Sequence, residues 1–101
     1  METQNEKPIE AMRDLLYALN DFIKRHPVMN CFYSVELHCG NEIRMQGYLD
    51  DILFDYLLLN DFEIEEQRLM KDGSTSIHMK QPFYSIYGKY DVVIVLIDRK
   101  K

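Results

Sequence analysis

The chain has 101 residues, which is enough for one folded domain over residues 1–101 and no more. Apolar residues make up 47% of it, which is typical of a globular protein and excludes a chain that is disordered throughout. The formal net charge of −5 excludes a general affinity for phosphate backbones, so nucleic-acid binding would need a local basic patch.

The apolar runs and the first residues indicate where the protein works. No run approaches the roughly 20 apolar residues that span a bilayer. The start, "METQNEK", lacks the basic and apolar regions of a secretory signal. We therefore expect a cytoplasmic protein without membrane association, in which residues 1–7 are disordered.

The first expected element is a helix over residues 8–26. Apolar side chains recur at helical spacing from Ile9 to Ile23. Pro8 suits a first helical turn, and Pro27 ends the helix. We expect the apolar stripe to pack on the core; the alternatives are a partner's groove and a membrane surface.

After Pro27 the period changes to an alternation that predicts strands. "FYSVELHC" and "EIRMQGYLD" alternate apolar and polar residues on either side of a "GN" turn, which predicts a hairpin. Gly47 falls on the inward face of the second strand. A glycine there marks tight curvature or the close approach of another segment.

The segment "GYLDDILFDYLLLN" continues this alternation with one interruption. If the alternation continued without a break, the Asp51 side chain would point into the core, which does not accept a carboxylate without a partner. One extra residue at Asp50–Asp51, a β-bulge, would restore the register and bend the strand sharply. We therefore expect a bent strand that continues to Leu59 with apolar residues on both faces.

The remaining strands follow from "NDFEIEEQRLM", from "TSIHMKQPFYSIY" after a turn at "KDGS", and from "KYDVVIVLIDRKK". We expect the middle one of these to end near Pro82. The predicted fold is mostly β with an N-terminal α-helix: five strongly bent antiparallel strands form a small barrel over residues 31–98. Closure of the barrel would remove exposed strand edges.

The run "VELHCGNEIRMQGYLDDILFDYLLLND" resembles the first signature of the Sm-like family of small β-barrels, and its second half is similar to SH3-like barrels. The matching positions are Val35, Leu37, Gly40, Ile43, Gly47, Leu49 and Leu59. The resemblance implies a helix followed by a five-stranded barrel and a tendency to form rings. It does not carry the family's RNA pocket, because Leu53 stands where that pocket has an acidic residue and the second signature is missing.

The residues give no support for an enzymatic function. The chain has no glycine-rich phosphate loop, no nucleophile elbow and no helical His-Glu metal motif. His26, His38 and His78 lack metal-ligand spacing. The adjacent carboxylates Asp50 and Asp51 would face opposite ways on a strand, so they offer no acid–base pair. We expect no catalysis, no cofactor and no metal.

One set of residues is a candidate nucleic-acid surface. Single-strand binders stack bases on exposed rings beside a few cations, and the C-terminal third offers both. The candidates are His78, Lys80, Tyr84, Tyr87, Lys89 and Tyr90. The alternative is that these tyrosines are partly buried with their hydroxyls in water.

A second set is a candidate protein contact. Between Gly47 and Gln67 the chain has seven acidic residues and no lysine or arginine. An acidic segment of this kind suits a basic protein surface or mimics a phosphate backbone; the alternative is a solvated face that keeps the protein soluble. The candidates are Asp50, Asp51, Leu53, Asp55, Leu57 and Leu59. Their two-sided apolar strand also predicts self-association through paired strand edges.

The predicted function is therefore binding. The first hypothesis is a small regulatory module that resembles Sm-like proteins and contacts RNA or a protein partner. The second is an acidic adaptor or inhibitor that docks on a basic protein surface and binds no nucleic acid.

Overall fold

The computed structural model describes residues 8–26, 32–38 and 41–98. Two helices, α1 (Pro8–Arg25) and α2 (Asp51–Leu59), accompany five strands. The strands are β1 (Ser34–His38), β2 (Glu42–Tyr48), β3 (Glu63–Leu69), β4 (Thr75–Ser85) and β5 (Gly88–Asp98). The predicted helix over 8–26 and the predicted hairpin of β1 and β2 are confirmed. The expected disorder of residues 1–7 lies outside the described residues.

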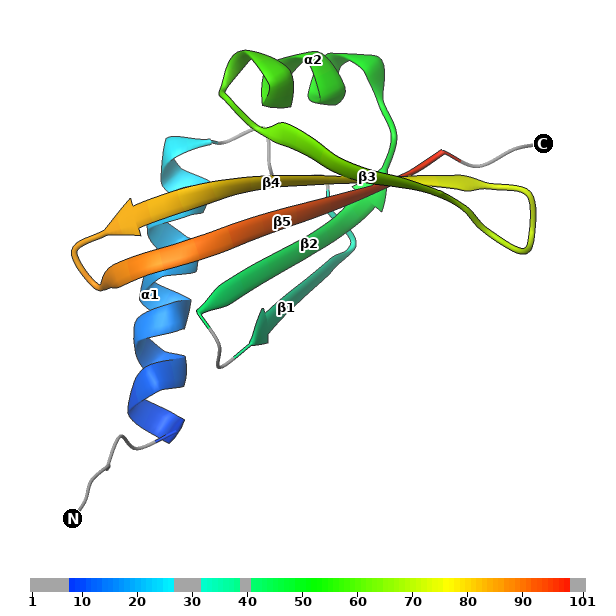
Figure 1. Ribbon diagram of the computed structural model, residues 1–101. Coiled ribbons are helices and arrows are strands. Elements are labelled where there is room, and N and C mark those ends of the chain that lie inside the picture. Colours follow the sequence, from blue (N-terminus) through cyan, green and yellow to red (C-terminus); the bar gives the residue numbers. More distant parts are fainter. Residues whose placement is uncertain (1–7, 27–31, 39–40, 99–101) are drawn as a thin grey trace.

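The strands form one sheet in the order β1-β2-β5-β4-β3 (Figure 1). All neighbours are antiparallel except β2 and β5, which run parallel with Ile43 opposite Val92. β4 passes through Pro82 and ends at Ser85, so the expected end near Pro82 is wrong. The β4–β5 hairpin has the longest strand pairing in the sheet. It runs from Thr75 opposite Asp98 to Ser85 opposite Gly88.

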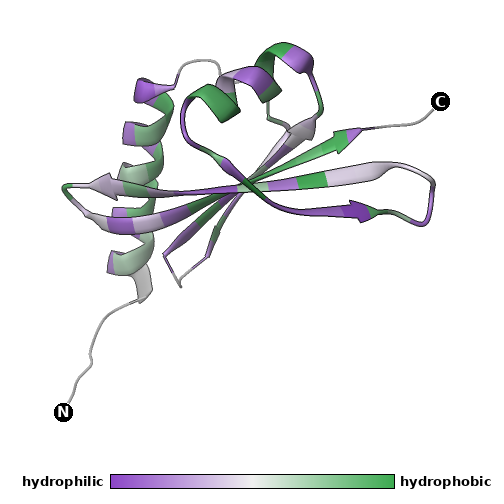
Figure 2. Ribbon diagram, turned by 45° about the horizontal axis from the view of Figure 1, so that its top comes forward, coloured by the Kyte–Doolittle hydropathy of each residue, from purple (hydrophilic) through white to green (hydrophobic). Residues whose placement is uncertain are grey.

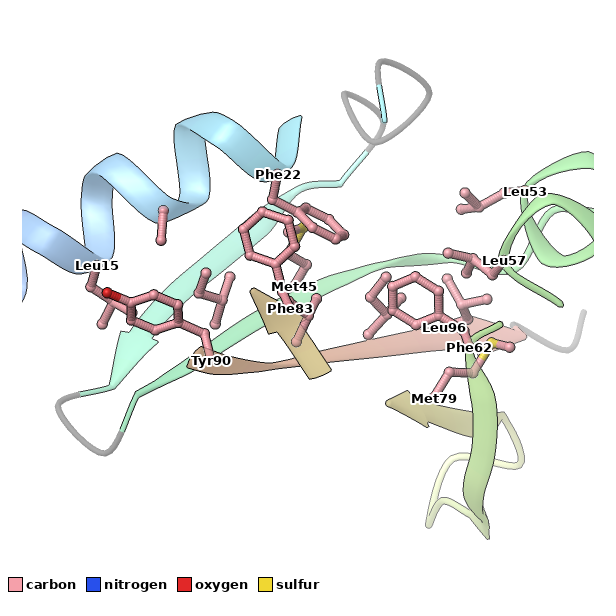
Figure 3. Close-up of a cluster of buried hydrophobic side chains, with 14 residues drawn as sticks. Leu15, Phe22, Met45, Leu53, Leu57, Phe62, Met79, Phe83, Tyr90 and Leu96 are labelled. Atoms are coloured by element: carbon pink, nitrogen blue, oxygen red, sulfur yellow. The ribbon is translucent and has the colours of Figure 1, made fainter. Parts of the chain in front are cut away.

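Both helices pack on the same face of the sheet. Leu15, Ala18 and Phe22 of α1 and Leu53 and Leu57 of α2 belong to one buried cluster. Its sheet side consists of alternate residues of β5 and their neighbours: Ile43, Met45, Met79, Phe83, Tyr90, Val92, Ile94 and Leu96. Figure 3 shows α1 over the Tyr90 and Phe83 end and α2 over the Leu96 and Met79 end. The opposite face of the sheet, called the open face here, has no helix over it among the described residues.

The bent strand expected through Asp50–Leu59 is wrong, because these residues form helix α2. Asp50 is the helix cap rather than a bulge: its side chain accepts a hydrogen bond from the Leu53 amide at 3.0 Å. Leu53 and Leu57 are four residues apart and both face the core, which is the helical period. The alternation along "DILFDYLLL" does not correspond to two sheet faces.

The closed antiparallel barrel is also wrong for the described part of the chain. β1 and β3 lie at opposite ends of the sheet and do not pair. The physical reason is the same helix, since the residues that were to bend and close the sheet cover one of its faces instead. The sheet keeps two exposed edges.

The close approach expected at Gly47 is confirmed. Gly47 is buried, and a Cβ atom added there would lie 2.7 Å from Cδ1 of Phe32. Phe32 packs partly buried against the core. The glycine therefore makes room for the ring that leads into β1.

Candidate protein-binding surface at the end of α2 and the edge of β3

Helix α2 begins and ends at residues whose hydrogen bonds cap it. Asp50 has an extended backbone and caps the first turn, with the acidic Asp51 next to it. At the other end the Phe62 amide bonds to the Leu57 carbonyl at 3.0 Å, and the Asp61 amide bonds to the Leu58 carbonyl at 3.2 Å. This is a Schellman motif, and Asp61 supplies its left-handed residue with φ 69°.

The helix divides the candidate protein-contact residues into two groups. Leu53 and Leu57 are buried in the core and contact no partner surface. Asp51, Asp55 and Leu59 are exposed, and Leu59 is 82% exposed. Ile52, one turn before Asp55, is 75% exposed. The helix leaves Ile52, Leu58 and Leu59 exposed. The two most exposed, Ile52 and Leu59, lie seven residues apart on one helical stripe.

Strand β3 follows α2 and lies at the edge of the sheet with every residue exposed. Its pairing with β4 shifts between Ile64 and Glu66, which is a β-bulge. A bulge and charged side chains both blunt an edge strand against unspecific pairing. Figure 2 shows this hydrophilic strand directly after the apolar and acidic helix α2.

We name the exposed residues along α2 and the first half of β3 the acidic–apolar surface. Its members are Asp51, Ile52, Asp55, Leu58, Leu59, Asp61, Glu63, Ile64 and Glu65. Among the described residues only one of its carboxylates has an ion pair, Glu65 with Lys80 at 4.0 Å. The others offer their charge to solvent or to a partner.

Two cavities open where this surface meets β4. One, of about 350 Å³, is lined by Arg25, His26, Leu59, Asn60, Asp61, Gln81, Pro82, Phe83 and Tyr84. The other, of about 320 Å³, is lined by Asp61, Glu63, Ile64, Glu65, Lys80 and Pro82. The two adjoin, because Asp61 and Pro82 line both. Their volumes lie at the low end of the range of ligand pockets, roughly 300–1,000 Å³.

The walls of the larger cavity are held by specific contacts. The Gln81 side-chain amide donates to the Asn60 carbonyl, which ties β4 to the end of α2. The Arg25 guanidinium lies 5.0 Å from the centre of the Phe83 ring, a cation–π contact. His26 Nδ1 and the Tyr56 hydroxyl are 2.7 Å apart. Burial, and then the charge of Arg25, lower the pKa of His26 below its ordinary value.

The structure brings together only part of the candidate nucleic-acid set. His78, Lys80, Tyr84 and Lys89 lie on the open face, because they alternate with the core residues of β4 and β5. The Lys89 ammonium lies 5.8 Å from the centre of the Tyr84 ring, and that tyrosine is 62% exposed. This corner has the ring and the cation that stacking needs.

The other two members lie elsewhere. Tyr90 is 4% exposed on the core face, and its hydroxyl donates to the Tyr87 carbonyl at 2.9 Å. The ring of Tyr87 packs against that of Tyr17 of α1, tilted by 37° with ring centroids 5.2 Å apart. The ring of Tyr90 is therefore buried, and a base cannot stack on it.

His78 also differs from a free cation. Burial first, and then the nearby charge of Arg68, lower its pKa below the ordinary value, although Glu66 opposes this. Its Nε2 lies 3.2 Å from the Ser76 hydroxyl. The positive charge of this face at neutral pH therefore comes from Arg44, Arg68, Lys80 and Lys89. Arg44 pairs with Glu42 at 2.9 Å, and Arg68 pairs with Glu66.

Sequence reasoning missed Ile52 and the cavity beside Tyr84. The signal for Ile52 was available, because Ile52, Asp55 and Leu59 recur at helical spacing after an Asp-Asp cap. The cavity had no signal, since it forms where Arg25, Asp61 and Pro82 meet from three distant parts of the chain.

Comparison with protein-family models, with curated protein sequences and with solved structures finds no match to this chain. The resemblance to Sm-like and SH3-like barrels therefore stays a prediction. Among the described residues, neither helix is long and apolar enough to cross a membrane. In the same part of the chain, no three His, Cys, Asp or Glu side chains converge on a possible metal site.

Proposed function

We propose that the protein is a non-enzymatic binding module that docks on a basic protein partner through the acidic–apolar surface. This is the second of the two functions that the sequence suggests, and it shares the protein partner with the first. The observation that carries it is the exposure of Ile52 and Leu59 beside the carboxylates of Asp51, Asp55 and Asp61, which have no ion pairs with described residues.

Apolar side chains exposed together and rimmed by polar groups are typical of interaction sites. Burial of Ile52 and Leu59 would supply affinity, at roughly 25 cal/mol per Å² of apolar area. The surrounding carboxylates would select a positively charged partner and speed the encounter. Neither contribution needs a catalytic group or a cofactor.

RNA binding has weaker support. The open face has Tyr84 and Lys89 together, but Glu65 lies next to Lys80 and Glu66 pairs with Arg68. Carboxylates beside the cations oppose a phosphate backbone, whose binding depends on net positive charge. RNA binding is therefore the alternative function, and the experiment below also tests it.

Selection from a library of displayed peptides tests the proposal. The intact protein serves as bait, and a matched bait carries Ile52→Lys and Asp55→Lys, both at exposed positions of α2. We expect the selection to enrich peptides with Lys or Arg next to apolar residues, and these should bind the matched bait about 10-fold more weakly. Their affinity should fall with added salt.

Two results would overturn the proposal. One is a selection that enriches no basic peptide, and the other is enriched peptides that bind both baits equally. Binding of single-stranded poly(U) RNA, weakened by Tyr84→Ala or Lys89→Ala, would move the assignment to the open face.

Self-association is a separate proposal. The predicted two-sided strand is a helix, and we propose that self-association uses the exposed Ile52 and Leu59 of α2. Light scattering at micromolar concentration tests it, since a monomer there would remove it.

A further inference from the structure

We propose that the free edge of β4 at Pro82–Tyr84, with the two cavities beside it, binds a short extended segment of a basic partner. The segment would occupy the strand position that β3 leaves empty. This inference rests on the proposed function and names the part of the partner that is recognised.

The empty position follows from the pairing. β3 pairs with β4 only as far as Glu63 opposite Lys80. β4 continues to Ser85, and β5 pairs with it along this whole length. No described strand lies on the other side of Gln81–Ser85. The chain leaves this edge because Asp61 and Phe62 turn away into α2.

The backbone groups that face this edge can be derived from the register. The Asp91 amide donates to the Asn41 carbonyl at 2.9 Å, so the backbone of Asp91 points toward β2. Pro82 is opposite Asp91. Because facing pairs alternate between bonded and non-bonded, the Pro82 carbonyl and both backbone groups of Tyr84 point away from β5. The edge therefore offers two acceptors and one donor.

These three groups suit a short segment better than a long strand. Proline has no amide hydrogen, so Pro82 stops regular pairing from continuing along the edge. An added strand gains affinity from main-chain hydrogen bonds and specificity from pockets for its side chains. Here the main chain of β4 offers three hydrogen-bonding groups, and the two cavities supply the side-chain pockets.

The cavities select the side chains. The smaller one has Asp61, Glu63 and Glu65 on its walls against the single cation Lys80, with Ile64 and Pro82 beside them. It suits the aliphatic stem and the charged head of a lysine or arginine. The larger one combines the apolar Leu59 and Pro82 with polar residues such as Arg25, Asp61 and Gln81. It suits a side chain with an apolar stem and a polar end.

A second copy of this chain fits the edge poorly. Two β4 edges in antiparallel contact would each lack the amide of Pro82, and both would bring the same carboxylates of Asp61 and Glu63 together. Like charges across a contact disfavour it. The charge of the site therefore points to a different, basic chain.

The test uses a fluorescein-labelled peptide of sequence Lys-Val-Arg-Val-Lys and the intact protein at concentrations up to about 1 mM. We expect saturable binding by fluorescence anisotropy and none for the peptide Glu-Val-Glu-Val-Glu. Tyr84→Pro removes the one outward donor at a position that needs no amide for pairing with β5. We expect it to weaken binding about 3- to 10-fold.

A charge variant and a matched control complete the design. Glu63→Lys should weaken binding about 10-fold and reduce its salt dependence. Glu36→Lys makes the same change on β1, at the far edge of the sheet, and should leave affinity within about 2-fold. Thermal unfolding of each variant checks that it folds.

The outcomes separate this inference from the proposed function. If the basic peptide binds and only Ile52→Lys weakens it, the acidic–apolar surface stands and the edge site is overturned. If neither this peptide nor any peptide from the library binds, both are overturned. Sedimentation that shows β4-dependent dimers would also overturn the edge site, because its occupant would be a second copy.

Discussion

Proline placed at two aspartates of α2 tests the helix that replaced the expected bent strand. Asp51 is the first residue of α2, and Asp55 lies in its middle. Proline is tolerated in a first helical turn, where the amide has no partner inside the helix. Asp50, with φ −140° and ψ 133°, already has the extended backbone that a residue before proline prefers.

The expected magnitudes differ by several kcal/mol. Asp51→Pro loses a favourable charge at the helix start, roughly 0.3–1 kcal/mol, and restricts the unfolded chain by about as much. Its free energy of unfolding should stay within about 1 kcal/mol of the parent value. Asp55→Pro loses a helical hydrogen bond and clashes with the preceding turn, so it should lose about 3 kcal/mol or more.

Urea unfolding followed by circular dichroism measures both free energies of unfolding. By thermal unfolding, the loss at Asp55 corresponds to a midpoint lower by about 12 °C or more. On a strand, both prolines would remove ladder hydrogen bonds and cost similar amounts. Equal losses at the two positions would refute the helix.

Three further predictions concern stability. Asp61→Gly should raise the free energy of unfolding by up to about 1 kcal/mol, since glycine adopts the left-handed backbone freely; a decrease on urea unfolding would contradict this. Leu57→Ala should lower it by about 2–5 kcal/mol, whereas the exposed Leu59→Ala should change it by less than about 0.5 kcal/mol. Because the folded protein lowers the pKa of His26 and His78 below 6.5, the unfolded chain binds more protons there, and stability should fall as pH falls from 6.5. Urea titrations at several pH values should show this fall, and it should shrink in a variant with both His26→Gln and His78→Gln.

The elements with an unambiguous period could be predicted from the sequence. α1 has apolar residues at helical spacing and a proline at each end, and β1 and β2 alternate around a turn. The strand prediction for residues 51–59 was wrong, because apolar residues are so dense there that they fit both the helical and the strand period. Only Ile52 there is β-branched, and the leucines favour a helix. The Asp-Asp pair before them was a cap signal.

The open sheet could not be predicted, because its topology depends on contacts between distant residues. Nothing local marks the parallel pairing of β2 with β5, which joins Ile43 to Val92. The candidate site could be predicted only in part, because it too depends on how distant residues fold together. The acidic charge between Asp50 and Glu66 is visible in the sequence, whereas the exposure of Leu59 and the burial of Leu53 need the helix.

Chemical-shift mapping with a peptide from the library tests the central proposal most directly. The ¹⁵N-labelled protein is titrated with the best basic peptide, and the perturbed backbone amides are located. We predict that the shifts concentrate in residues 51–66 and 81–84, with the Tyr84 amide among the largest. Shifts confined to β1 and β2, or spread evenly over the molecule, would contradict the account.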